Sequence, residues 1–172
     1  MPIYALGDLV PDIHSDAFVH PDAVIIGDVT IGQFSSIWPC AVLRGDSNRI
    51  VVGDRTSIQD GAVIHVTHDL PTLIGSDCTV GHNAHLEGCH IHDGALVGSG
   101  ALVHHKATIQ TGALIAAGAV VTHGTVVPSG ALAVGIPARI KLGAADQNVL
   151  SYSVATYVEN AKRYPGLLRR ID

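Results

Sequence analysis

A six-residue period of aliphatic side chains is the feature that most constrains the fold of this chain. A bulky residue recurs at every sixth position through most of the sequence, and a small side chain follows four residues after nearly every one. Two inward positions per six residues do not fit a helix that repeats every 3.6 residues, but they fit short strands joined by tight corners. The bulky positions are Val19, Ile25, Ile31, Ile37, Leu43, Val52, Ile58, Ile64, Ile74, Val80, Leu86, Ile91, Val97, Val103, Ile109, Ile115, Val121 and Val127.

Glycine often stands beside these positions, as at Gly32, Gly81 and Gly98. A chain that turns every sixth residue needs backbone conformations that residues with a Cβ atom adopt poorly. The repeat therefore predicts an all-β solenoid, a parallel β-helix of hexapeptide repeats with three sides to each coil. In such a coil each residue stacks on the residue that lies one full coil further along the chain.

The period also divides the chain. Residues 1–140 are predicted to form the β-helix, because the repeat decays after Val127 and Pro137 ends the strand pattern. Residues 141–172 are predicted to form a C-terminal helix packed on the β-helix. Within them, from Asp146 to Arg170, apolar residues recur at intervals of three and four, which is typical of an amphipathic helix. We expect this helix to cover one side of the prism.

Composition excludes several classes of function. The 172 residues are of single-domain size, and 47% hydrophobic with 15% charged residues argues against disorder. A net charge of -5 without a basic cluster argues against a nucleic-acid partner. No apolar run approaches the roughly 20 residues that span a bilayer, and the first residues lack an export signal, so we expect no membrane partner. Three cysteines that form no even framework indicate a reduced, cytoplasmic setting.

The six-residue period is interrupted three times, and all three interruptions fall near a histidine-rich stretch. Three residues are added between Leu43 and Val52, four are added between Ile64 and Ile74, and one is missing between Leu86 and Ile91. Interruptions in a solenoid become loops and bulges that leave one face, frequently the binding face. The histidine-rich stretch is therefore the candidate site.

The repeat predicts where the side chains of this stretch point. Since Leu86 stands one coil beyond Ile64, the residues that follow them, Glu87 and His65, are outward-facing neighbours about 4.8 Å apart. His85 emerges on the same face as Glu87, whereas His82 falls at a corner and projects away from its own prism. A hydrolytic Zn²⁺ site takes three nitrogen or oxygen ligands and keeps one position for water. The pattern thus predicts a metal site, and we interpret the other histidines, His104 and His105 among them, as ordinary surface residues.

Four further stretches of the chain are distinctive: AVLRGD at Ala41–Asp46, SIQDGAVIHVTH at Ser57–His68, TVGH at Thr79–His82, and GIPARI at Gly135–Ile140 followed by YVENAKRY at Tyr157–Tyr164. Together they resemble the motifs of the γ-class carbonic anhydrase family, and the resemblance covers nearly the whole chain. It implies a left-handed parallel β-helix with a C-terminal helix, assembled as a homotrimer whose metal sites lie between subunits. The implied activity is the hydration of CO₂ to bicarbonate with Zn²⁺, or with Fe²⁺ or Co²⁺.

The resemblance also implies roles for single residues. His65 resembles the first metal histidine, and His82 resembles the ligand that comes from the neighbouring subunit. Gln59 and Asp60 resemble the polar pair near the metal-bound water, where Gln59 would orient the attacking hydroxide. Tyr157 resembles a tyrosine near the site, although an amphipathic core role explains it equally well.

Two further roles follow from the same resemblance. Arg44 and Asp46 resemble the pair that stabilises the trimer, while the residues alone fit equally well a charge pair that steadies a loop. Metal binding lowers the pKa of water to about 7 from 15.7 in bulk, and a histidine at the rim, His68 or His85, would carry the released proton.

The chain departs from the family pattern at the third ligand. Where the family usually reads L-H-G-C, this chain reads Leu86-Glu87-Gly88-Cys89. Zn²⁺ accepts two histidines and a carboxylate, so either Glu87 or His85 would complete the site. A carboxylate lowers the net positive charge of the site and makes its bound water less acidic.

Three functions therefore stay open. The first is the carbonic anhydrase, and the second is a catalytically weak or inactive structural or accessory trimer of the same fold. The third is a hexapeptide-repeat acyltransferase or thioesterase. Against the third, the chain lacks a long histidine-bearing loop after the repeats.

Overall fold

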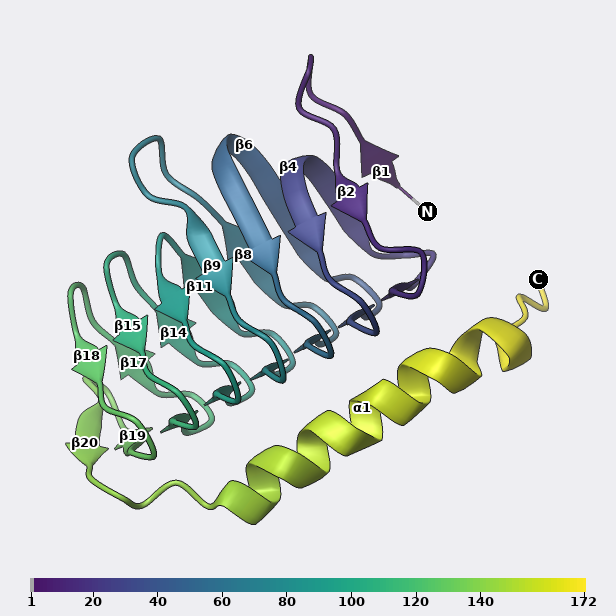
Figure 1. Cartoon of the computed structure of the whole chain (residues 1–172). Coiled ribbons are helices and arrows are strands. Elements are labelled where there is room, and N and C mark those ends of the chain that lie inside the picture. Colours follow the sequence, from purple (N-terminus) through teal and green to yellow (C-terminus); the bar gives the residue numbers. More distant parts are fainter. Residues whose placement is uncertain (1) are drawn as a thin grey trace.

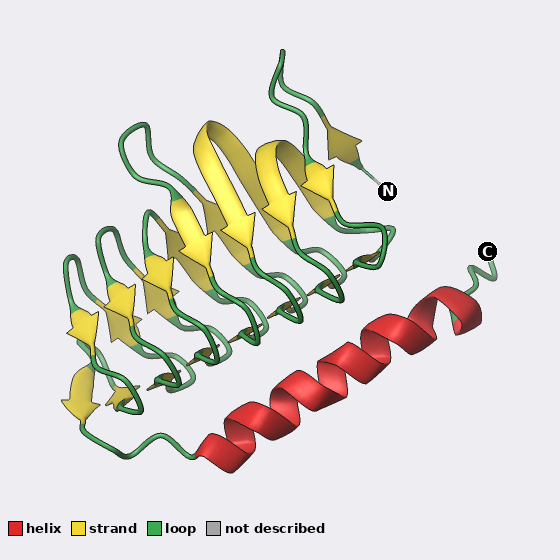
Figure 2. Ribbon diagram, viewed as in Figure 1, coloured by secondary structure: helices red, strands yellow, loops and turns green. Residues whose placement is uncertain are grey.

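Parallel strands stacked in three columns build the body of the molecule, a left-handed β-helix, in the computed structural model, which describes residues 2–172 (Figures 1 and 2). One helix, α1 (Gln147–Leu167), runs alongside it. The strands are β1 (Ile3–Tyr4), β2 (Asp12–Ile13), β3 (Phe18–Val19), β4 (Val24–Ile31), β5 (Ser36–Ile37), β6 (Val42–Val52), β7 (Ser57–Ile58), β8 (Val63–His65), β9 (Thr72–Ile74), β10 (Thr79–Val80), β11 (His85–Glu87), β12 (His90–Ile91), β13 (Leu96–Val97), β14 (Leu102–Val103), β15 (Thr108–Ile109), β16 (Leu114–Ile115), β17 (Val120–Val121), β18 (Val126–Val127), β19 (Leu132–Val134) and β20 (Arg139–Lys141).

Two sheets account for the three sides of the prism. One side is the sheet β20-β19-β16-β13-β10-β7-β5-β3, in which only β20 runs antiparallel to its neighbour. The other two sides form one sheet, β17-β14-β11-β8-β6-β9-β12-β15-β18, because the long strand β6 passes through the corner between them. From β7 to β19, every third strand along the chain therefore lies in the same column, as the hexapeptide period predicts. Before β7 the interval is two strands, because the long strands β4 and β6 each pass through a corner.

The predicted inward positions form the core. Ile25, Ile37, Ile58 and Leu86 expose none of their surface, and the small residues that follow four positions later, such as Ala41 and Ala62, are equally buried. Burial of each of these isoleucine and leucine side chains stabilises the fold by about 1.5–3 kcal/mol. The core is thus one continuous column of aliphatic side chains along the axis of the solenoid.

The interruptions of the period take different forms. The three added residues after Leu43 do not leave the sheet as a loop: β6 continues through them beside β4, with a register shift between Gly27 and Val29. The four residues added after Ile64 do form a loop, which projects from the corner between β8 and β9 (Figure 1). The first interruption is a bulge in β6, because β6 advances from Gly45 to Ile50 while its partner β4 advances only from Gly27 to Val29.

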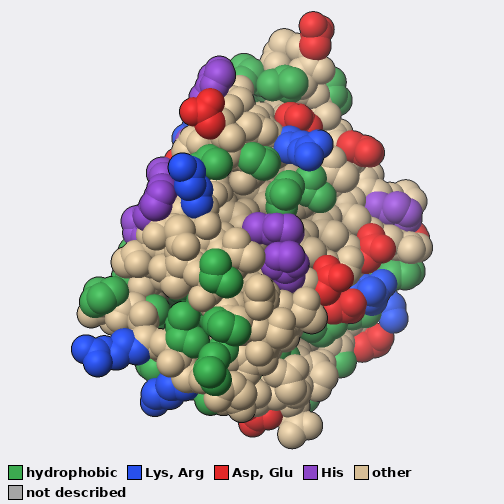
Figure 3. Space-filling view, turned by 60° about the vertical axis from the view of Figure 1, so that its left-hand side comes forward, with side chains coloured by type: hydrophobic (Ala, Val, Ile, Leu, Met, Phe, Trp, Pro, Cys, Tyr) green, Lys and Arg blue, Asp and Glu red, His purple; other side chains and the backbone are tan. Residues whose placement is uncertain are grey.

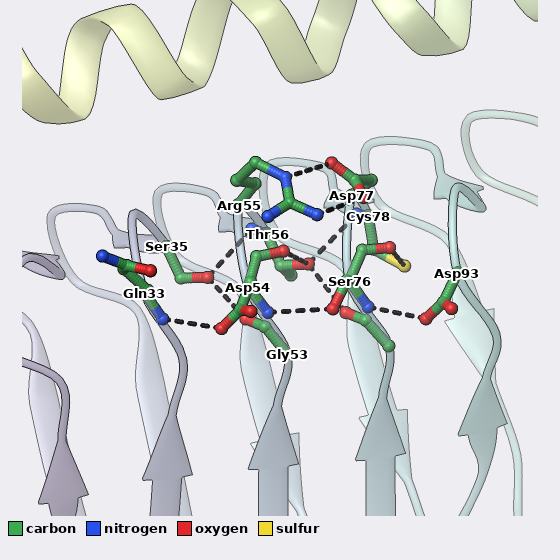
Figure 4. A network of polar contacts seen from close by, with 11 residues as sticks. Gln33, Ser35, Gly53, Asp54, Arg55, Thr56, Ser76, Asp77, Cys78 and Asp93 are labelled. Carbon is green, nitrogen blue, oxygen red and sulfur yellow. Dashed lines mark hydrogen bonds and ion pairs between the residues drawn. The ribbon is translucent and has the colours of Figure 1, made fainter.

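A ladder of polar contacts holds the corner that follows the glycines Gly32, Gly53 and Gly75 (Figure 4). The backbone N–H of Gln33 donates to Asp54 Oδ1 at 2.8 Å, that of Asp54 to Ser76 Oγ at 3.1 Å, and that of Ser76 to Asp93 Oδ1 at 2.8 Å. Each side chain therefore satisfies a backbone donor of the preceding coil. We call Gln33, Asp54, Ser76 and Asp93 the Asp54 ladder.

Helix α1 begins where the Asp146 carboxylate accepts the N–H of Asn148 at 3.0 Å. It then runs back along the solenoid toward the first coils and packs on β3, β5, β7 and β10 (Figure 1). An aromatic cluster holds it there, in which Trp38 lies 5.5 Å from Tyr157 and 4.9 Å from Tyr164 between ring centroids. Within residues 2–172, no helix has the length and apolarity that crossing a bilayer requires.

Candidate functional site

The candidate site lies on the side of the prism formed by β6, β8 and β11. The register of these strands aligns Arg44 with His65, and His65 with Glu87. All three side chains point outward, because Leu43, Ile64 and Leu86 beside them fill the core. The stacking that the period predicts for His65 and Glu87 is therefore present in the strand pairing.

His65 lies between two carboxylates. Its Nδ1 is 3.0 Å from Glu87 Oε1 and its Nε2 is 3.2 Å from Asp46 Oδ1. Asp46 also pairs with Arg44 of the same chain. Burial raises the pKa of Asp46, but hydrogen bonds from Ser47, Arg44 and His65 outweigh it and lower that pKa overall. Both carboxylates are thus held in the charged form beside the imidazole.

The second oxygen of Glu87 faces two more histidines. Glu87 Oε2 lies 3.3 Å from His105 Nε2 and 3.5 Å from His85 Nε2. Burial raises the pKa of Glu87, and hydrogen bonds from His105 and His65 reverse that effect, so that the pKa falls below its ordinary value. We call Asp46, His65, Glu87 and His105 the His65 row.

His105 is the site residue that the sequence pattern missed, since we interpreted it as an ordinary surface histidine. The register pairs Leu86 with Val103, so the position beyond Glu87 in the next coil is His104, and His105 follows in the turn. The pair of consecutive histidines one coil beyond Glu87 was the signal that could have identified it.

His82 takes no part in this cluster within one chain. It lies at the corner between β10 and β11, where its Nδ1 is 2.9 Å from Asp60 Oδ2. Both side chains are 46% exposed, so the imidazole of His82 is partly open to solvent. Within residues 2–172, no group of three or more histidine, cysteine, aspartate or glutamate side chains is arranged to hold a metal ion. The chain thus brings His65, His85 and Glu87 together but leaves His82 apart.

The remaining predicted residues lie outside the cluster around His65. Gln59 is only 5% exposed and follows β7 directly. Tyr157 belongs to the aromatic cluster under α1, and burial, assisted by the negative charge of Asp60, raises its pKa. His68 stands on the loop after β8, 92% exposed and 3.2 Å from Asp69.

Two donor atoms of the His65 row are spaced as two ligands of one divalent metal ion would be. Two ligands of one tetrahedral ion with bonds near 2.0–2.1 Å stand roughly 3.3 Å apart. His65 Nδ1 and Glu87 Oε1 are 3.0 Å apart, close to that separation. Imidazole nitrogen and carboxylate oxygen suit Zn²⁺, Fe²⁺ and Co²⁺. One chain therefore offers two adjacent donors, and a complete site needs at least one more.

Figure 3 shows histidine side chains at several separate places on one face of the molecule. Four histidines outside the candidate site have partners of their own. His90 and His92 stack on each other with ring centroids 4.0 Å apart, and His14 and His20 each accept the backbone N–H of an aspartate two residues on. None of these four contacts the His65 row. They behave as the ordinary surface residues that the sequence analysis predicts.

Comparison with known proteins identifies relatives of two kinds. The family model described as bacterial transferase hexapeptide (six repeats) matches residues 11–45, 71–105 and 88–123. A probable carbonic anhydrase of Methanocaldococcus jannaschii is 45% identical over 150 residues, which cover 87% of this chain and 91% of that protein. The carnitine operon protein CaiE of Escherichia coli is 38% identical over 170 residues, which cover 99% of this chain and 84% of that protein.

A further curated relative and a solved structure also match this chain. The mitochondrial gamma carbonic anhydrase 2 of Arabidopsis thaliana is 51% identical over 100 residues, 55% of this chain. The match spans only 36% of the plant protein, about a third of its length. A crystal structure from Bacillus cereus, described as a putative acetyltransferase, superposes with a TM-score of 0.93 at 38% identity, covering 96% of this chain and 98% of that chain.

Proposed function

This chain belongs to the γ-class carbonic anhydrase family of hexapeptide-repeat proteins, and from that premise we propose that it forms a homotrimer that hydrates CO₂ to bicarbonate at metal sites between subunits. The observation that carries the proposal is the division of the donors. His65 and Glu87 stand together on one side of the prism, while His82 projects from a corner with its Nδ1 already occupied by Asp60. Two donors from one subunit and His82 from the next would complete a site of three ligands.

The ion we propose is Zn²⁺, with Fe²⁺ or Co²⁺ as alternatives that the same donors accept. When bound, such an ion supplies a hydroxide nucleophile near neutral pH by lowering the pKa of water. In this proposal Glu87 is the third ligand, because His65 faces it directly, whereas His85 faces only the outer oxygen of Glu87.

The neighbouring side chains have positioning roles. Asp60 fixes the tautomer and orientation of His82 through Nδ1, which leaves Nε2 free to point toward the next subunit. Asp46 supports His65 in the same way, and Arg44 holds Asp46. We propose that Arg44 and Asp46 also help to orient neighbouring subunits, since both lie on the side of the prism that carries His65.

Substrate handling falls to residues near the rim. The buried amide of Gln59 would orient the attacking oxygen by hydrogen bonding. His85, 39% exposed and next to Glu87, is placed to carry a proton between the site and solvent through Nε2. Tyr157 contributes by packing on Trp38 at a position where the charge of Asp60 reaches it.

A catalytically weak or accessory trimer is the second candidate. The observation that favours it is that Glu87 already accepts hydrogen bonds from His65 and His105 within one chain, so the row is satisfied without a metal ion. A relative named for a carnitine operon rather than for an anhydrase agrees with it. The third candidate, an acyltransferase or thioesterase, is supported by the description of the Bacillus cereus relative as a putative acetyltransferase.

The test is to purify the protein without chelator and to measure its sedimentation, its metal content and its rate of CO₂ hydration by stopped flow. We expect trimers with one divalent ion per chain. Glu87→His should keep the metal and raise the rate, because a neutral ligand leaves more positive charge to acidify the bound water. His123→Ala, an exposed histidine outside the row, is the matched control.

Trimers that neither contain nor take up Zn²⁺ or Co²⁺ would rule out the anhydrase and leave the accessory trimer. Turnover of a panel of acyl-CoA thioesters, with no CO₂ hydration, would favour the third candidate instead.

A further inference from the structure

The two oxygens of Glu87 face opposite neighbours along the solenoid. Oε1 faces His65 in the preceding coil, at 3.0 Å, and Oε2 faces His105 in the following coil, at 3.3 Å. The carboxylate therefore spans three successive coils with its partners. A glutamate side chain has three rotatable bonds, so without the outer partner its carboxylate would be free to turn away from His65.

The turn after β14 holds His105 in this position. The N–H of Lys106 donates to Gly88 O at 2.7 Å, which ties the turn to the residue that follows Glu87. A Cβ atom on Gly88 would stand 3.0 Å from Leu70 Cβ and 3.4 Å from His105 Cδ2. The close approach of Leu70 and the positive φ of Gly88, 59°, thus favour glycine in this turn beside His105.

We propose that His105 is the positioning residue of Glu87: by holding Oε2 it aims Oε1 at the metal position beside His65. This inference rests on the proposed function, since it concerns how the substituted third ligand binds the ion. Hydrogen-bonded partners of metal ligands typically contribute about 10–100-fold in metal affinity. His85 is a weaker partner of the same oxygen, because its distance of 3.5 Å exceeds that of His105.

The inference makes the role of His105 specific to a carboxylate at position 87. An imidazole at that position has fewer rotatable bonds and no second oxygen for His105 to hold. The contribution of His105 should therefore disappear when Glu87 is replaced by histidine. A residue that only stabilised the turn would contribute equally in both backgrounds.

The experiment is a double-mutant cycle on metal affinity, with the wild type, His105→Ala, Glu87→His, and the variant that carries both changes. Dissociation constants for Co²⁺ and Zn²⁺ are measured by chelator competition, and the Co²⁺ absorption spectrum reports the ligand geometry independently of activity. We expect His105→Ala to weaken binding about 10–100-fold beside Glu87 and less than about threefold beside histidine. His105→Gln, whose amide nitrogen stands near the place of Nε2, should restore part of the loss.

His104→Ala is the matched control, because His104 is the exposed neighbour in the same turn, and its metal affinity should stay that of the wild type. Sedimentation and melting of each variant verify that the trimer is intact, and His105→Leu, which fills similar space without a hydrogen-bonding group, replaces His105→Ala in the cycle if the latter fails to fold. Equal losses in both backgrounds, or no loss in either, would overturn the inference while leaving the proposed function in place. A wild type that takes up no metal would overturn both.

Discussion

The Asp54 ladder and the His65 row are both series of polar residues that extend across successive coils, but they consist of different kinds of contact. In the Asp54 ladder, side-chain oxygens accept backbone N–H groups at 2.8–3.1 Å (Figure 4). In the His65 row, the contacts join ionisable side chains to each other. In the Asp54 ladder the donors are backbone N–H groups, whose positions are fixed by the fold. In the His65 row the partners are side chains, which are able to change their conformation and bind another group.

This difference indicates that the Asp54 ladder supports the fold and that the His65 row is available for a ligand. A hydrogen bond to a backbone N–H contributes about 0.5–1.5 kcal/mol. The donors of the Asp54 ladder are fixed by the backbone of each corner, so the ladder contributes to the stability of the fold. Contacts between partly exposed charged side chains contribute less, typically below about 1 kcal/mol. The His65 row therefore gives up little stability when a metal ion replaces its hydrogen bonds.

The largest effect should come from breaking the corner beneath the Asp54 ladder. In Gly53→Ala the new Cβ would stand 2.6 Å from the backbone carbon of Gly75, so the coils must separate. We expect a loss of about 3 kcal/mol or more in the free energy of unfolding, measured with urea. Gly166→Ala is the control, because open space surrounds that glycine in α1, and it should be neutral or stabilising. A Gly53→Ala protein as stable as wild type would contradict the tight stacking of the coils.

One variant in the Asp54 ladder and one in the His65 row should have different effects on stability and on metal affinity. Asp54→Ala removes the acceptor of the Gln33 N–H and should cost about 0.5–1.5 kcal/mol of stability with unchanged metal affinity. Glu87→Gln should weaken metal binding about tenfold or more while changing stability by less than about 1 kcal/mol. Urea unfolding and chelator competition on both variants measure the two quantities. If both variants lost similar amounts of stability and of metal affinity, the distinction between the Asp54 ladder and the His65 row would be wrong.

The smallest effect that we predict is a loss of stability of the metal-free protein at acidic pH. The folded-state pKa values of Asp46 and Glu87 lie below their ordinary values of 3.8 and 4.5. Groups whose pKa is lowered by folding stabilise the protein above their ordinary pKa, and this contribution is lost as pH falls through the lowered values. Metal-free protein should therefore lose stability below about pH 4.5, and Glu87→Gln should lose less. Melting between pH 3 and pH 6 tests this, and superimposable curves would count against the role of Glu87.

The sequence period predicted those parts of the site that depend on strand register. His65 and Glu87 stack because Ile64 and Leu86 occupy equivalent inward positions one coil apart. His105 could not be predicted in this way, because it leaves the register in a turn and reaches Glu87 through its side-chain conformation. The same holds for Asp46, whose contact with His65 depends on β6 continuing through three added residues as a strand.

The side of the prism beneath α1 has a consequence for experiments in solution. Trp38 is the only tryptophan of the chain, and it is wedged between the early coils and Tyr157 and Tyr164 of the helix. Its indole N–H donates to the hydroxyls of Ser36 and Ser57, both at 3.0 Å. The fluorescence of this protein is thus an optical probe of helix docking, and a change in emission would signal that the C-terminal segment had lifted away from the coils.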